Sequence, residues 1–179
     1  MKKILLFLLA LAYLLPAKSQ DVYISTNSTV SFFSETPVEN IDATSNQVVG
    51  ALNVSTKTVF FKAKMTTFTF KKALMQEHFN ENYVESDVFP DAVFVGKIIE
   101  EVDLTLDGTY EIRAKGKFTV HGVAQERIIK SSVTVKNGMI VIRSAFTVLL
   151  ADHNIPVPKV VHEKLASEIK VEVNAELKQ

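Results

Sequence analysis

The sequence predicts an all-β protein, an antiparallel up-and-down barrel of about eight strands with one short inserted helix. Long stretches alternate between apolar and polar residues, as strands with one buried face do. Dipeptides typical of tight turns separate several of these stretches. One stretch changes to the helical period of 3.6 residues.

Residues 1–19 are expected to be a targeting signal rather than part of the fold. Lys2-Lys3 precedes an apolar run over residues 4–15, and Ala17-Lys18-Ser19 offers small residues for cleavage. This order is typical of a secretory signal peptide, and the run is too short for a membrane anchor. We therefore expect residues 20–179 to form one exported domain.

Charge and cysteine content narrow the class of protein. Without the three lysines of the signal, 17 basic and 20 acidic side chains remain, a net charge of −3. No basic stripe is present, so nucleic acid is not an expected partner. The chain has no cysteine, so an exported domain must be stabilised by its core rather than by disulfides.

The first half of the domain contains several short strand candidates. The stretch over residues 38–46 is polar and shows no clear period, whereas the stretches around it alternate or carry β-branched and aromatic residues. The predicted strands cover residues 22–26, 29–34, 48–54 and 59–65, the last continuing to residue 70.

Residues 71–83 form the inserted helix. Leu74 with His78, and Met75 with Phe79, recur at i, i+4 spacing, which predicts an amphipathic helix of about three turns. No serine or threonine cap is apparent. The apolar face of this helix needs a partner, and we expect it to pack on the mouth or the interior of the barrel.

The pattern in the second half of the domain predicts an antiparallel meander. The residues from Thr109 to Val120 alternate without a break, and similar stretches precede and follow them. The predicted strands cover residues 92–106, 109–120, 125–136, 139–150 and 168–177, with a short helical turn at 160–165. Three dipeptides predict tight turns: Asp107-Gly108, His121-Gly122 and Asn137-Gly138.

The apolar faces of these strands are expected to point inward. A closed barrel of eight strands either fills its interior with side chains or holds one small ligand. Phenylalanines gather in and beside the helical insertion, which favours an apolar pocket for a chain-like lipid. The predicted ligand-binding residues are Phe32, Phe61, Phe68, Phe70, Leu74, Met75, His78, Phe79, Phe94, Ile112, Phe118 and Phe146.

Residues 116–123 read Gly-Lys-Phe-Thr-Val-His-Gly-Val, which resembles the G-x-L-T-I-H-G-V segment of the YceI-like family of bacterial periplasmic lipid-binding proteins. Glu77-His78-Phe79 and Phe89-Pro90, with the residues after each, are similar to a second family block. Departures include Ala124, where the family has threonine.

The resemblance implies a lipocalin-like barrel in the periplasm, often a homodimer. Its hydrophobic tunnel would hold a polyisoprenoid or another long-chain amphiphile. It implies no cofactor and no integral membrane domain.

Two alternatives remain open at this stage. One is a structural or interaction barrel with a filled core. The other is an enzyme that uses His78 with Glu77 or Glu81, although no catalytic motif supports it. No metal site is expected, because the four histidines share no ligand spacing and no thiolate is available.

Overall fold

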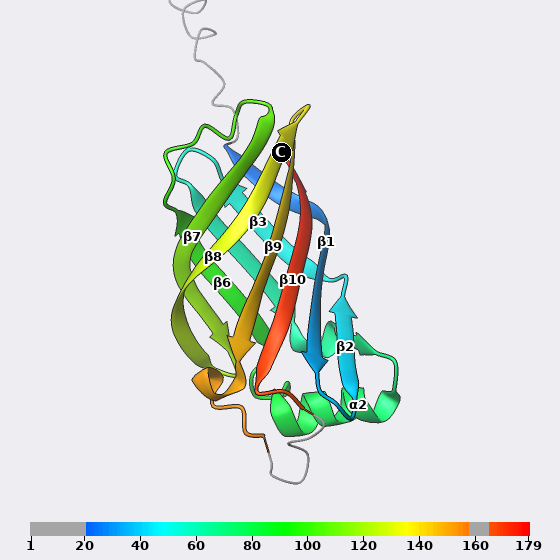
Figure 1. Cartoon of the computed structure of the whole chain (residues 1–179). Coiled ribbons are helices and arrows are strands. Elements are labelled where there is room, and N and C mark those ends of the chain that lie inside the picture. Colours follow the sequence, from blue (N-terminus) through cyan, green and yellow to red (C-terminus); the bar gives the residue numbers. More distant parts are fainter. Residues whose placement is uncertain (1–20, 158–164) are drawn as a thin grey trace, which may run out of the picture.

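Eight antiparallel strands close into a ring in the computed structural model, which describes residues 21–157 and 165–179 (Figure 1). The predicted signal peptide and most of the predicted helical turn at 160–165 lie outside these residues. The ring strands, in spatial order, are β1 (Val22–Glu35), β3 (Val48–Asn53), β4 (Thr58–Lys64), β6 (Asp91–Ile98), β7 (Gly108–Val120), β8 (Val123–Lys136), β9 (Met139–Leu149) and β10 (Glu168–Lys178). Because β10 pairs back with β1, the predicted closed barrel is confirmed.

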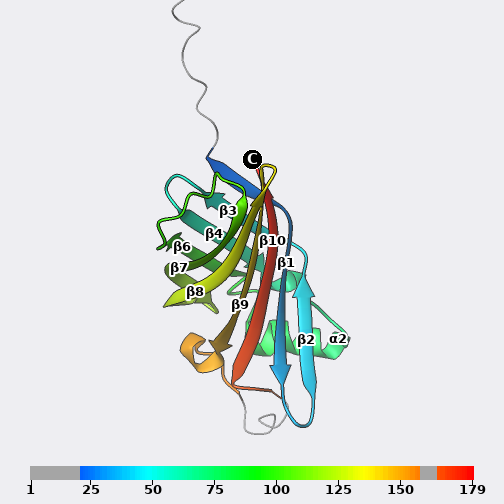
Figure 2. The ribbon, with the colours of Figure 1, turned by 45° about the horizontal axis from the view of Figure 1, so that its top comes forward.

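The first strand is longer than predicted and changes its partner. The prediction of two strands was wrong, because β1 runs unbroken over 14 residues, with a register shift between Ser25 and Asn27 in its pairing with β10. Its beginning pairs with β3, and its second half pairs with β2 (Asn40–Ser45). The sequence did not predict β2, because its pattern is largely polar. β2 pairs in turn with the two-residue β5 (Thr69–Phe70), outside the ring (Figure 2).

Two of the three predicted tight turns are present. His121 and Gly122 have φ of 50° and 70°, and Asn137 and Gly138 have φ of 52° and 74°, as a type I′ turn requires. The third prediction was wrong. Gly108 begins β7 without a positive φ, and residues 99–107 form a longer loop instead.

The helical insertion is shorter and less regular than predicted. α2 (Ala73–His78) continues into η3 (Phe79–Tyr83), a turn of π-helix, and Lys72 caps α2 without a side-chain hydrogen bond. α2 and η3 lie at one end of the barrel, which we call the helix end (Figure 1). In the described part of the chain, no helix is long and apolar enough to cross a membrane.

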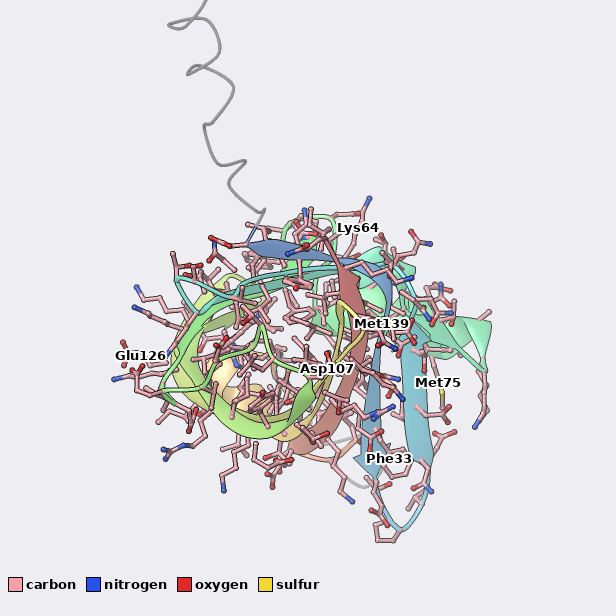
Figure 3. All side chains as sticks on the ribbon, turned by 90° about the horizontal axis from the view of Figure 1, so that it is seen from above. Phe33, Lys64, Met75, Asp107, Glu126 and Met139 are labelled. Atoms are coloured by element: carbon pink, nitrogen blue, oxygen red, sulfur yellow. The ribbon has the colours of Figure 1, made fainter. Side chains whose placement is uncertain are left out.

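The opposite end, which we call the hairpin end, is packed solid. It carries the Asn137-Gly138 turn and the loop 99–107, whose Leu104 is 2 % exposed and plugs the barrel. In Figure 3, which looks down on this end, Asp107 and Met139 lie over the ring. The side chains packed here are almost fully buried: Tyr23, Leu52, Leu104, Val133, Val135, Ile140, Ala175 and Leu177.

Acidic residues fasten the loop 99–107 to the barrel. The Glu100 carboxylate accepts hydrogen bonds from the backbone N–H and the Nε of Arg113, both at 2.7 Å. These bonds, the backbone bond first, hold the pKa of Glu100 below its ordinary value of 4.5. Asp103 accepts hydrogen bonds from Thr105, which lower its pKa as well.

We expect this loop to loosen first on acidification. A carboxylate whose pKa is lowered in the folded state stabilises it above the unfolded-state pKa, and this stabilisation is lost as the pH falls through the lower folded-state value. Amide protection factors around Leu104 should therefore fall between about pH 5 and pH 3. The Glu100→Gln variant should show reduced protection already at neutral pH. Protection that is equal in both proteins at every pH would contradict this assignment.

Candidate ligand cavity

The helix end of the barrel encloses an apolar cavity of about 320 Å³. Its lining extends from α2 to a floor formed by Ile98, Ile112 and Ile142, which also belong to the packed core. None of the fully buried side chains at the hairpin end lines it. The hollow is therefore closed at one end, a blind cavity rather than a tunnel through the barrel.

Strand β10 shows the division of the interior most clearly. Its inward-facing residues alternate along one face, yet Ala175 and Leu177 are 0 % exposed whereas Val171 and Val173 are only half-buried. All four lie on the inner face of the ring, and Val171 and Val173 line the cavity, although Val173 also borders a groove on the outer surface. The interior is filled at the hairpin end and hollow at the helix end.

Eleven of the twelve predicted ligand-binding residues line this cavity. They come from the strands, from the segment around β5, and from α2 and η3: Phe32, Phe61, Phe68, Phe70, Met75, His78, Phe79, Phe94, Ile112, Phe118 and Phe146. Leu74 does not line the cavity, and 61 % of it is exposed. Successive helical residues are about 100° apart, so Leu74 points away from the side on which Met75 reaches the cavity. Contact of these residues with a ligand stays a prediction.

Four phenylalanines from three segments form an aromatic cluster at the cavity wall. Phe32 lies 5.4 Å from Phe68 and 5.3 Å from Phe79 between ring centroids, and Phe70 lies 5.0 Å from Phe79. Several of these ring pairs are tilted or edge-on, which are arrangements that aromatic pairs prefer. This cluster joins β1, the β5 segment and the helical insertion, so the insertion packs on the barrel interior, as predicted.

Two charged residues that line the cavity, Glu39 and Lys62, each form an ion pair. Lys72 Nζ lies 2.6 Å from Glu39 Oε1, and Lys62 Nζ lies 3.6 Å from Asp91 Oδ2. His78 lines the cavity but is exposed, and it makes no hydrogen bond within the described residues. It is therefore not a buried core histidine, and no hydrogen bond orients it as a general base.

His121 connects three segments at the helix end. Its Nδ1 donates to the His153 carbonyl at 3.0 Å, its Nε2 lies 2.6 Å from a Glu85 carboxylate oxygen, and Phe89 packs on its ring. His121 therefore does more than form the predicted turn, because its ring also holds the loop after η3. His153 is fully buried, and its Nδ1 donates to the Val123 carbonyl at 3.0 Å.

Other lining residues were not singled out from the sequence. They include Val30, Met65, Ile129, Val171 and Val173. The alternating pattern places them on the inner face, but nothing in it separates the hollow half of a strand from the filled half. No group of three His, Asp or Glu side chains able to hold a metal lies within residues 21–157 and 165–179.

The chain is thus a small closed antiparallel barrel with an apolar cavity at one end. The profile of the YceI-like domain matches residues 23–177. The chain belongs to the YceI-like family. The comparison with curated proteins found no match.

Solved structures share this fold at low sequence identity. A polyisoprenoid binding domain from Saccharophagus degradans, implicated in plant cell wall breakdown, superposes with a TM-score of 0.75 at 11 % identity, covering 89 % of this chain and 99 % of that one. BcnA from Burkholderia cenocepacia superposes with a TM-score of 0.66 at 13 % identity, covering 83 % of this chain and 95 % of that one. The YceI protein of Campylobacter jejuni superposes with a TM-score of 0.58 at 12 % identity, covering 74 % of this chain and 81 % of that one.

Proposed function

We propose that this protein binds and sequesters a long-chain apolar lipid, a polyisoprenoid or a fatty-acid-like molecule, in the cavity at its helix end. The observation that carries the proposal is the half-buried state of inward-facing side chains such as Val171 and Val173. A barrel that served only as a structural unit would fill this space, as it does at the hairpin end.

The cavity suits a chain rather than a polar solute. Its lining is almost wholly apolar, and each methylene buried in it contributes about 0.8 kcal/mol. Affinity would therefore rise with chain length until the chain reaches the floor at Ile98, Ile112 and Ile142. A head group would stay near the helix end, where the charged residues lie.

Location is part of the proposal. Residues 1–19 would direct export and be removed, and the mature domain would act in the periplasm. The family supports this location, and the Saccharophagus degradans domain, described as polyisoprenoid-binding, supports the class of ligand.

A homodimer is also part of the proposal. An apolar row crosses four neighbouring strands on the outer face of the barrel, through the paired residues Ile24, Ala51, Phe60 and Val95. Ile24 is 56 % exposed and Val95 is 48 % exposed, which supports a partner surface here. Light scattering on the mature protein should give twice the monomer mass, and Ile24→Lys should restore the monomer.

Native mass spectrometry tests the lipid proposal. Mature protein purified gently from its own host should carry an added mass that organic extraction identifies as a lipid. The apo-protein should then take up one equivalent of a fluorescent fatty acid or a polyprenol. A chain that emerges without lipid and takes up neither probe contradicts the proposed function.

A further inference from the structure

The barrel wall has a seam between β8 and β9. The two strands pair only from Ser131 with Ser144 to Lys136 with Met139. Beyond this point, residues 123–130 of β8 pair with β7 alone, and residues 145–149 of β9 pair with β10 alone. Figure 2 shows the two strands diverging toward the helix end. The closed ring therefore lacks its backbone ladder along this stretch.

Side chains bridge the seam in place of the ladder. Ser144 Oγ donates to the Lys130 carbonyl at 2.7 Å, and Arg127 Nη2 donates to the Thr147 carbonyl. Gln125 Nε2 donates to the Asp152 carbonyl at 2.7 Å. Each of these bonds can break and re-form by rotation of one side chain, whereas opening a strand ladder breaks several backbone bonds together.

The seam lies directly beside the cavity. Ile129 on the β8 side and Phe146 and Val148 on the β9 side all line the hollow. Ser131 and Ser144, where the ladder ends, line both the cavity and a groove on the outer surface. The wall between the inside and the outside is therefore one layer of small side chains thick at this point.

Each edge of the seam carries one large exposed apolar side chain among polar neighbours, which are Glu126 and Lys130 on β8 and Thr147 on β9. Ile128 on β8 is 56 % exposed and Leu149 on β9 is 44 % exposed, one on each side of the opening. Nothing in the folding of a closed wall requires exposed apolar residues on both edges. An alkyl or prenyl chain that passes from outside to inside would contact both.

Two cations lie on the β8 side of the seam, Arg127 and Lys130, and Arg127 is the one on the inner face of the strand. Glu126 points away from the barrel in Figure 3. Because neighbouring residues of a strand point to opposite faces, the side chain of Arg127 leaves β8 on its inner face. Its β7 partner is Gly116, and the backbone of Val95 and Gly96 on β6 fills the space that a side chain on Gly116 would take. Unlike Lys62 and Lys72, Arg127 has no carboxylate partner within the described residues. Its guanidinium carries five N–H donors, and the bond to Thr147 uses few of them.

We infer that this seam is a lateral entrance for a single-chain amphiphile, and that Arg127 binds the anionic head group of that amphiphile. A carboxylate or phosphate would replace the Thr147 carbonyl as the partner of the guanidinium, because bonds between two charged groups are stronger than bonds to a neutral carbonyl. The seam would open as the head group engages, and the chain would pass between Ile128 and Leu149 into the cavity. This inference rests on the proposed function and adds the route and the head-group class.

Head-group selectivity tests the role of Arg127. Equilibrium binding is measured for a fluorescent fatty acid and a polyprenyl phosphate, and for the neutral alcohol of each. Arg127→Gln, which keeps a donor for Thr147, should weaken binding of one or both anionic probes about tenfold and leave the alcohols within about twofold. Arg127→Lys should retain part of the preference, and Arg143→Gln, on the outer face of β9, should retain all of it. The probe that responds identifies carboxylate or phosphate.

Crosslinking tests the entrance itself. The chain has no cysteine, so Ile128→Cys and Thr147→Cys can be joined by a short bismaleimide; the two positions are opposite each other when the register of Ser131 with Ser144 is extended by three residues. Stopped-flow uptake of the probe should slow at least about tenfold after crosslinking. The matched control joins Lys117→Cys with Glu126→Cys across the intact ladder of β7 and β8, and its uptake rate should not change.

The outcomes separate this inference from the proposed function. If the wild-type protein binds the probes but Arg127→Gln weakens acids and alcohols equally or not at all, the head-group role is overturned. If the crosslinked seam admits lipid at the wild-type rate, the lateral entrance is overturned and the lipid-binding function stands. If the wild-type protein binds none of the four probes, both fail.

Discussion

Replacing Val173 with tryptophan is expected to weaken lipid binding strongly while the barrel stays folded. Val173 is half-buried and lines the cavity, so the larger side chain has empty space to occupy. An indole in this position excludes several methylenes of a bound chain, each contributing about 0.8 kcal/mol. The expected loss of affinity is about 100-fold, measured by titration with a fluorescent fatty acid.

The neighbouring Asn174→Trp is the matched control. Asn174 is exposed on the outer face of the same strand, so its substitution adds the same ring without entering the cavity. Its affinity should equal that of the wild type, and both variants should melt within a few degrees of it. Unchanged binding by a folded Val173→Trp protein would show that the lipid lies elsewhere.

Replacing Ile140 with alanine is expected to cost about 2–5 kcal/mol of unfolding free energy. Ile140 is 0 % exposed at the hairpin end, where no hollow lies beside it, so the truncation leaves a new void in a packed core. The same substitution at Ile41, which is half-buried and lines the cavity, should cost under about 2 kcal/mol, because that space is already open.

Urea denaturation of the two variants measures this contrast. The midpoint for Ile140→Ala should fall well below that for Ile41→Ala, with similar slopes in both. Equal losses would mean that the cavity wall formed by β2 is packed as tightly as the hairpin end. The difference between the variants therefore compares the filled core with the wall of the cavity.

The features of this fold that depend on the local order of apolar, polar and turn-forming residues could be predicted from the sequence. The unbroken alternation from Thr109 to Val120 predicts β7 because one face of that strand meets the interior along its whole length. Asn137-Gly138 predicts its turn because both residues tolerate positive φ. The helical period around Met75 and Phe79 predicts the insertion, although not the π-helical turn that ends it.

The features that depend on tertiary contacts could not be predicted from the sequence. Asp107-Gly108 has the composition of a tight turn, but the burial of Leu104 requires a longer loop that plugs the barrel. β2 is largely polar and is held by pairing with β1, a contact that its own residues do not encode. The seam depends on where the β8–β9 ladder ends, and both strands alternate equally well on either side of Ser131.

At the candidate site, too, the sequence predicts which residues face inward but not which of them line the cavity. Inward-facing Val171 and Leu177 occupy the same face of β10, and the sequence marks both simply as apolar. Whether an inner position meets another side chain or an empty space depends on the shape of the whole ring and on what closes each end. The aromatic residues near the helix were a useful guide, because η3 and the β5 segment bring them to the hollow end.

The most direct test of the central claim is an NMR measurement of where a bound chain lies. With methyl-labelled isoleucine, leucine and valine and an unlabelled fatty acid, the account predicts intermolecular NOEs to Ile112, Ile129 and Val171. It predicts none to Leu52 or Leu177 in the filled half. NOEs confined to outer-face residues such as Ile24, or reaching the filled half equally, would contradict a blind lipid cavity at the helix end.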